Sequence, residues 1–246
     1  MESQYQTGLN NVQYTEHIVL RCPSTLYNGS PKSAAAASSS SSSGCFASGT
    51  LITLPNQKQI PIEQLQSGEE LLTTDGSTIF TTQMVMMLDK NRLSQAIFHT
   101  ITTTSGHYVS LTELHLVPII ENDNTINYIP AKQIKIGDLL YVMSNGQLVS
   151  STVTNVILEM KTGFYAPLTT SGTLFANGIM TSCYANVRSH RAAHLSMGPL
   201  RFYHWLAQLL SINEPFGHQN MESVHVIPKV MYELVHFLYP SALQVS

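Results

Sequence analysis

An internal duplication limits the possible folds of this chain more than any other feature of its sequence. The segment IPIEQLQSGEELL at residues 60–72 aligns without gaps on IPAKQIKIGDLLY at residues 129–141. Both copies share an Ile-Pro start, a glutamine before an apolar residue, and a glycine followed by an acid. Two copies indicate one domain made of two related halves, because arrays of stacked units repeat three times or more.

The residues around the two copies have the pattern of an all-β protein. From Cys45 to about Val187 the chain consists of short apolar runs separated by turn residues. Each copy of the repeat is followed by a strong turn signal, Asp75-Gly76 in the first half and Asn145-Gly146 in the second, and each predicts a two-residue hairpin. We therefore predict an all-β domain over residues 45–189 with pseudo-twofold symmetry.

After about Ser189 the periodicity changes to that of helices. The segment PLRFYHWLAQLLSI carries polar residues three or four apart and has Pro199 in its first turn, as helices favour. The segment VIPKVMYELVHFLYP has a similar polar stripe at Lys229, Glu233 and His236. Both are shorter than the roughly 20 apolar residues that span a bilayer. Residues 190–246 are therefore predicted to be a short α-helical extension.

The first 44 residues read differently from the rest. Residues 33–43 are a low-complexity run of alanine and serine, which is typical of a linker. The first twenty residues lack the basic start and apolar run of a signal peptide. We expect residues 1–44 to be the remnant of an upstream module with its linker, in a chain that is truncated at its N-terminus.

Composition excludes several classes of protein. Only 11% of the 246 residues are charged and the formal net charge is −3, which argues against a nucleic-acid-binding surface. The three cysteines, Cys22, Cys45 and Cys183, are too few for a disulfide scaffold and too far apart for a zinc knuckle. We expect no metal and no cofactor, and at least one free thiol; the role of Cys22 is not indicated.

The position of Cys45, where the linker meets the first predicted strand, suggests a reactive thiol. A cysteine can attack the carbonyl of the preceding residue, here Gly44, and shift the acyl group from nitrogen to sulfur if the leaving nitrogen is protonated. Thr112 and His115 in the run TELH could hold the amide and supply that proton. On spacing alone, Cys45 could equally be a small buried hydrophobe and His115 a half-buried strand histidine.

These motifs occur together and in the order of a known family. The chain from Gly44 to its end resembles the C-terminal autoprocessing region of hedgehog proteins, the Hint module that they share with inteins. The matching blocks are Gly44-Cys45-Phe46, the Gly-acid pair of the repeat, Met87-Leu88-Asp89-Lys90, Thr112 with His115, the run APLTTSGTLFANGIMTSCYA at residues 166–185, and the helix from His190 to Arg201. The resemblance implies a flattened, pseudo-symmetric all-β fold, in agreement with the duplication.

The resemblance also implies an activity and a site. Cys45, Thr112 and His115 would form a thioester at the Gly44–Cys45 cleavage site, and Asp89 would activate a sterol hydroxyl that resolves it, leaving a steryl ester on Gly44. Cys183 would lie near the active site, where it could exchange thiols or form a disulfide with Cys45. Tail residues resembling the sterol recognition region are His225, Met231, Tyr232, Val235, Phe237 and Leu238; Pro228 and a missing Trp-Tyr pair depart from the family pattern.

The expected partners follow from this resemblance. They are a sterol or membrane lipid as co-substrate and an upstream signalling segment as covalent substrate, with no nucleic acid, in a monomer that passes through the endoplasmic reticulum to the exterior. The His-Asn pair that ends inteins is absent after Asn177-Gly178-Ile179, so we expect cleavage without splicing. Two alternatives stay open: water resolves the thioester, or the module binds lipid or a partner without processing itself.

Overall fold

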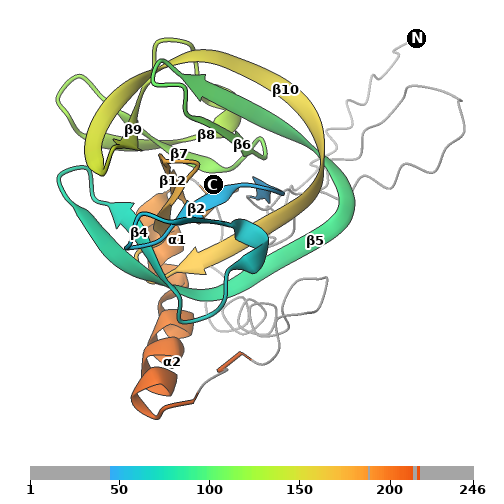
Figure 1. Cartoon of the computed structure of the whole chain (residues 1–246), viewed down its shortest axis with the longest axis vertical. Coiled ribbons are helices and arrows are strands. Elements are labelled where there is room, and N and C mark those ends of the chain that lie inside the picture. The colour runs from blue at the N-terminus through green and yellow to red at the C-terminus, as the bar shows by residue number, and fades with distance from the viewer. Residues whose placement is uncertain (1–44, 188, 213–214, 217–246) are drawn as a thin grey trace, which may run out of the picture.

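A computed structural model of the chain describes residues 45–187, 189–212 and 215–216. Strands account for most of the described part, and two helices follow them (Figure 1). The strands are β1 (Phe46–Ala47), β2 (Leu51–Thr53), β3 (Gln59–Pro61), β4 (Glu70–Thr74), β5 (Ile79–Thr103), β6 (Tyr108–Leu111), β7 (Leu116–Ile120), β8 (Ile126–Pro130), β9 (Leu139–Ser144), β10 (Gln147–Thr169), β11 (Thr173–Ala176) and β12 (Ile179–Ser182). This confirms the predicted all-β fold with a short helical extension.

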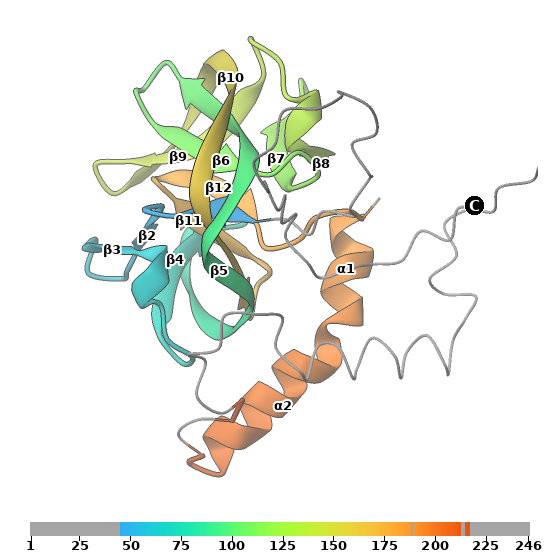
Figure 2. The ribbon, with the colours of Figure 1, turned by 90° about the vertical axis from the view of Figure 1, so that its right-hand side faces the viewer.

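Two very long strands, β5 and β10, form the frame of the module. They pair antiparallel from Val153↔Thr103 to Thr169↔Met84, and four register shifts along the way bend the ribbon. Figures 1 and 2 show this ribbon curling around the other strands. The sequence pattern of short apolar runs did not anticipate strands of 25 and 23 residues, because a bulged strand changes its buried face at each shift.

The short strands β1 and β6 lie between the two long ones. β1 pairs with β10 on one side and with β6 on the other, and β6 pairs in turn with β5. The first strand of the module is therefore interior to the sheet. Its residues Phe46 and Ala47 are buried, and so is Leu111 opposite Phe46.

The duplication in the sequence is a duplication in the structure. Each copy folds into a single 3-10 turn, η1 (Ile62–Gln64) and η2 (Ala131–Gln133), after a proline with φ near −60°. Gly68 and Gly137 both have positive φ, and their amides donate to Met84 and Val153 on the two long strands. The two halves therefore attach to β5 and β10 in the same way, which confirms the predicted relationship between them.

The two predicted hairpins differ in their turns. Asn145 and Gly146 form the expected two-residue turn between β9 and β10, with φ of 51° and 75°. The expectation of a two-residue turn at Asp75-Gly76 was wrong, because four residues separate β4 from β5. The Asp75 carboxylate accepts hydrogen bonds from the amides of Ser77 and Thr78, and this stabilises the longer loop.

The helical extension begins with α1 (His190–Ser196) and α2 (Gly198–Leu209). Ser189 caps α1 by accepting a hydrogen bond from the amide of Ala192, and Pro199 lies in the first turn of α2. Figure 2 shows both helices on one side of the strands, with α2 running beyond them. No helix among the described residues is long and apolar enough to span a membrane. The second predicted helix, VIPKVMYELVHFLYP, lies outside the described residues.

Candidate active site

The sheet places three of the four predicted site residues in one row. Thr112 lies opposite Cys45, since the Thr112 amide donates to the Cys45 carbonyl at 3.1 Å. The β1–β10 register, extended by one residue from Phe46↔Tyr165, sets Cys45 opposite Ala166, and Ala166 pairs with Asp89. Neighbouring strands lie about 4.8 Å apart, so about 10 Å separates the Cα atoms of Cys45 and Asp89. Residues in such a row share one face of a sheet.

The amide of Cys45 is held by a side chain. Its N–H donates to Oγ1 of Thr112 at 3.0 Å, and both residues are almost fully buried. The nitrogen that would leave in an acyl shift is therefore fixed in position. Cys45 is disulfide-bonded in this structure, so its thiol becomes available only after reduction. Gly44, the predicted acyl donor, lies outside the described residues.

The imidazole of His115 is fully buried and has a defined tautomer. Its Nε2 lies 2.8 Å from the carbonyl oxygen of Ser182, and a carbonyl only accepts, so Nε2 carries the proton. Burial lowers the pKa of His115 to about 4, against the opposing effect of the Ser182 carbonyl. The neutral ring therefore has a bare Nδ1, which is buried and makes no hydrogen bond within the described part of the chain.

Two contacts connect His115 with the neighbours of Cys45. The His115 amide donates to the Thr112 carbonyl at 3.0 Å, which closes the turn that carries both residues. The ring of His115 packs edge-on against Phe46, the residue after Cys45, with 4.6 Å between ring centroids. The Thr-x-x-His spacing thus sets the threonine and the histidine on the same side of one turn, beside the start of β1.

A segment after β12 holds the histidine in place. The Leu116 amide donates to the Tyr184 carbonyl, the Asn186 amide donates to the Leu114 carbonyl, and His115 forms a β-bridge with Ala185. The positioning is done by backbone atoms, so sequence reasoning had no residue type by which to find it. The Ser-Cys-Tyr-Ala block at residues 182–185 was identified only by its resemblance to the family.

Asp89 is buried and lies on β5. Ala166 stands between it and Cys45 in the row. This arrangement puts a carboxyl group on the same face as the cysteine, about 10 Å away along the row.

Cys183 is a free, buried cysteine. Burial raises the pKa of its thiol to about 11, and its sulfur lies 3.4 Å from Oγ1 of Thr169. A thiol with a raised pKa is a poor nucleophile at neutral pH. Because Cys183 is free, the disulfide between Cys45 and Cys183 that we considered possible is not present in this structure.

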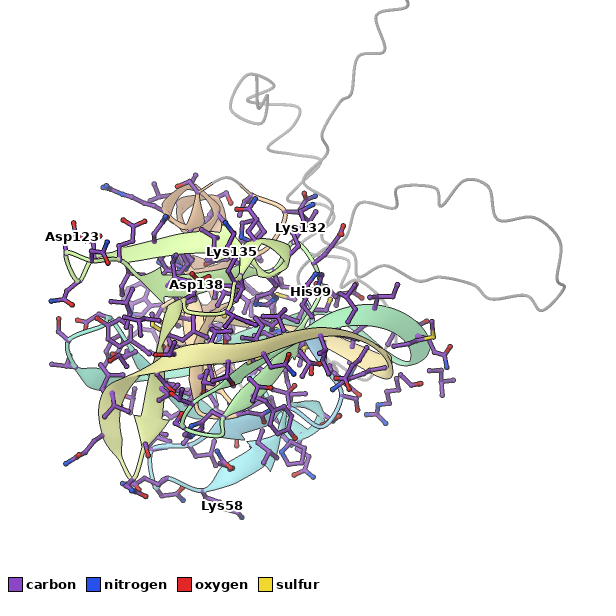
Figure 3. The ribbon with its side chains drawn as sticks, turned by 90° about the horizontal axis from the view of Figure 1, so that it is seen from above. Lys58, His99, Asp123, Lys132, Lys135 and Asp138 are labelled. Carbon is purple, nitrogen blue, oxygen red and sulfur yellow. The ribbon has the colours of Figure 1, made fainter. Side chains whose placement is uncertain are left out.

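One polar residue near the row was missed by sequence reasoning. His99 on β5 pairs with Leu111, whose other neighbour is Phe46. Burial lowers the pKa of His99, with Glu113 raising it and Lys132 lowering it further. Figure 3 shows His99 and Lys132 on the same side of the module, far from Lys58. An isolated histidine in a run of threonines gave no signal in the sequence.

The remaining predicted residues are not part of this geometry. The candidate sterol-binding residues His225, Met231, Tyr232, Val235, Phe237 and Leu238 lie outside the described residues. Within the described ranges, no group of three histidine, cysteine or acidic side chains is arranged to hold a metal ion.

Relatives of the chain carry hedgehog names. It is 27% identical to the Sonic hedgehog protein of Danio rerio over 210 residues, which is 80% of this chain and 50% of that protein. It is 31% identical to the Indian hedgehog protein of Gallus gallus over 204 residues, 80% of this chain and 48% of that protein. The chain thus spans about half the length of these relatives.

Solved structures of inteins are also similar. A DnaB intein from Synechocystis matches 58% of this chain and 99% of its own, with 11% sequence identity and a TM-score of 0.49. The family profile described as the Hint module matches residues 31–240. Since that match covers most of the chain, and the two related halves of the fold agree with it, this chain belongs to the Hint module family.

Proposed function

We propose that the module cleaves its own chain between Gly44 and Cys45 and transfers the upstream segment to a sterol. The observation that carries the proposal is the row Thr112–Cys45–Ala166–Asp89, with the neutral His115 beside it. Cys45, Thr112 and Asp89 lie in one row of the sheet, and His115 lies in the turn that borders it.

In the first step the reduced thiol of Cys45 attacks the carbonyl carbon of Gly44. His115 is neutral, because burial lowers its pKa to about 4, so its bare Nδ1 accepts the thiol proton. The resulting imidazolium gives that proton to the amide nitrogen of Cys45, which Thr112 holds. The C–N bond breaks as the C–S bond forms, and the products are a thioester and a free amine on Cys45.

In the second step an alcohol attacks the thioester. The resemblance to hedgehog proteins favours a sterol hydroxyl, and Asp89 accepts its proton. The C–O bond forms while the C–S bond breaks, so the upstream segment leaves as an ester on Gly44. The Cys45 sulfur leaves as a thiolate and takes up the proton that Asp89 has accepted, which restores the thiol and the carboxylate. Ala166, which lies between Asp89 and Cys45 in the row, has only a methyl group as its side chain.

The first step can be tested without a sterol. The chain is incubated with dithiothreitol, which reduces the cysteine and also resolves a thioester, and the fragments are weighed by mass spectrometry. A parallel sample with a phosphine reductant alone separates reduction from cleavage. We expect a break between residues 44 and 45 with dithiothreitol only, and none in Cys45→Ala or His115→Ala.

The second step is read from the mass of the upstream fragment. With cholesterol in detergent micelles and phosphine reductant, we expect that fragment to gain the mass of one sterol less water. A fragment with a free carboxyl group would show that water resolves the thioester. A chain that stays intact under every condition would show a binding module that does not process itself.

A further inference from the structure

A second polar cluster, centred on the hydroxyl group of Tyr184, joins the two helices to the strands. Its hydroxyl lies 2.9 Å from Nδ1 of His194 on α1, and Nη1 of Arg201 on α2 donates to the same hydroxyl at 3.1 Å. Tyr184 is only 4% exposed. A single buried oxygen therefore connects both helices to the segment that follows β12.

The direction of each hydrogen bond follows from chemistry. Arginine only donates, so the tyrosine oxygen accepts from Arg201 and has its own proton left to donate. His194 is neutral, because burial, Arg201 and His190 lower its pKa to about 4. Its Nδ1 therefore accepts the proton of Tyr184. The chain Arg201→Tyr184→His194 runs in one direction, and each bond strengthens the next.

The surroundings of this chain are closely packed. His190 stacks on Tyr128 of β8 with 4.0 Å between ring centroids, and its Nε2 donates to the carbonyl of Gly172 at 3.3 Å. A Cβ atom at Gly172 would lie 2.7 Å from Nδ1 of His194. The side chains of the cluster therefore pack closely against the backbone at Gly172, and this packing holds α1 against the strands.

Tyr184 also belongs to the segment that holds His115. Its carbonyl accepts from the Leu116 amide at 3.0 Å, and its amide donates to the Ser182 hydroxyl at 2.9 Å. The backbone of Tyr184 therefore supports the turn of the first step, whereas its hydroxyl serves only the helices. Replacing the hydroxyl separates these two tasks.

The helix that the hydroxyl secures has an apolar outer face. Phe202, Trp205 and Leu209 of α2 are 62%, 55% and 67% exposed, and α2 also packs against β5, the strand of Asp89. Such a face suits contact with an apolar alcohol, and its position depends on α1 and α2. The seating of the helices then matters for the second step alone.

We propose that the hydroxyl of Tyr184, with His194 and Arg201, is a positioning latch that seats α1 and α2 for the attack of the alcohol on the thioester. This inference rests on the function proposed above. The described contacts of the Tyr184 hydroxyl are with His194 and Arg201, so the hydroxyl acts through the helices.

The latch is tested first with Tyr184→Phe in the full chain, which removes the hydroxyl and keeps the ring. We expect amide hydrogen exchange to speed up by about tenfold across α1, since one buried hydrogen-bond pair is lost. Exchange in β10 and β12 should stay unchanged. Cleavage by dithiothreitol should remain within about twofold of wild type, and cholesterol-dependent cleavage should fall by about tenfold or more. Tyr108→Phe, at a half-exposed tyrosine on β6, is the matched control and should change none of these.

The latch also has a pH signature that depends on His194 and is confined to α1. When Nδ1 of His194 is protonated, it can no longer accept the hydrogen bond from Tyr184. The charged ring then lies close to Arg201 and His190, and its other neighbours Tyr128, Cys183 and Tyr184 carry no negative charge. As pH falls from 6.5 toward 4, the protection factors of the α1 amides, which compare each exchange rate with the intrinsic rate at the same pH, should therefore fall more than those of β10 and β12 in the wild type. His194→Asn, which places an acceptor near the position of Nδ1 but cannot take the proton, should remove that extra loss of protection in α1.

The outcomes are distinct. Unchanged α1 exchange in Tyr184→Phe overturns the latch, and faster exchange with undiminished cholesterol-dependent cleavage overturns its positioning role. If the wild type is not cleaved by dithiothreitol, the proposed function fails, while the exchange data still decide whether the latch exists. Should Tyr184→Phe fail to fold, Arg201→Met removes the donor from the other end of the cluster and should give the same results.

Discussion

Thr112 holds the amide that would be cleaved in the proposed reaction. Its Oγ1 accepts from the Cys45 amide at 3.0 Å. We expect Thr112→Val, which keeps the shape but not the acceptor, to slow dithiothreitol-induced cleavage by roughly tenfold to a hundredfold, as for loss of a buried hydrogen bond. Thr112→Ser should recover most of the rate. Equal rates in the valine and serine variants would show that the hydroxyl has no part in the reaction.

In the proposed mechanism Asp89 acts in the second step alone. It lies beyond Ala166 from Cys45 in the row, so it would serve the incoming alcohol and not the amide. We expect Asp89→Asn to keep dithiothreitol-induced cleavage within about twofold and to lose cholesterol-dependent cleavage by about a hundredfold. Equal loss of both activities would assign Asp89 to the first step or to the fold.

The sequence predicted the side chains of the site better than their supports. Cys45, Thr112 and Asp89 were identified from blocks in family order, and the structure brings them into one row. The Ser182 carbonyl, which sets the tautomer of His115, could not be predicted, since every residue has a carbonyl. Which carbonyl group meets His115 depends on how a segment 67 residues further along the chain packs against the turn.

The two copies of the repeat contain glycines at equivalent positions. Gly68 and Gly137 have φ of 85° and 101°. A Cβ atom would meet nothing within 4 Å at Gly137 and only Gln208 Nε2 at 3.9 Å at Gly68. Gly→Ala at either position should therefore cost only the strain of positive φ, about 1–2 kcal/mol in the free energy of unfolding.

A third glycine is the control for that comparison. At Gly178, between β11 and β12, a Cβ atom would lie 2.6 Å from the His107 ring. Gly178→Ala should cost clearly more than either repeat variant, measured by urea unfolding. A large difference between Gly68→Ala and Gly137→Ala would mean that the two halves are not equivalent in energy.

The elements also show where sequence patterns stop being informative. The duplication predicted the two halves because turn residues are local: proline, glycine and acid act within a few positions. The pairing of β5 with β10 is not local, and four register shifts break its alternation of buried and exposed residues. A pattern with period two then looks like several short strands.

Over the whole molecule, buried histidines make stability depend on pH. The pKa of His115 and of His194 is lowered to about 4, chiefly by burial, and burial also lowers the pKa of His99, His190 and His204. The unfolded chain, with pKa near 6.5, binds more protons between pH 4 and 6.5. Stability is thus full above pH 6.5 and declines as pH falls toward 4.

That decline is measurable by urea unfolding under reducing conditions at pH 7.5 and pH 5. We expect a lower midpoint at pH 5, with a smaller difference in His115→Gln. Asp75 and Asp123 also have lowered pKa values, from hydrogen bonds with nearby amides and hydroxyls, but they lose their contribution only below pH 4. A midpoint that does not change between these pH values would contradict the neutral state of His115.

The chain beyond α2 is expected to serve the lipid and not the acyl shift. A chain that ends near Asn213 keeps the row, His115 and both described helices. We expect it to be cleaved by dithiothreitol at the wild-type rate and to form no steryl ester. If it still forms the ester at an undiminished rate, the tail does not present the sterol.

The burial of Cys45 decides what happens between the two steps. Its nitrogen lies in a residue with no exposed surface, and the acyl shift would leave a primary amine there. Burial disfavours the charged ammonium, so the amine stays neutral, next to the thioester it has just left. In the proposed reaction that amine would be able to re-form the peptide bond, so the uncleaved chain and the thioester would interconvert reversibly. A chain that met no acceptor would return to its original state, and the arrival of the alcohol would make the exchange irreversible.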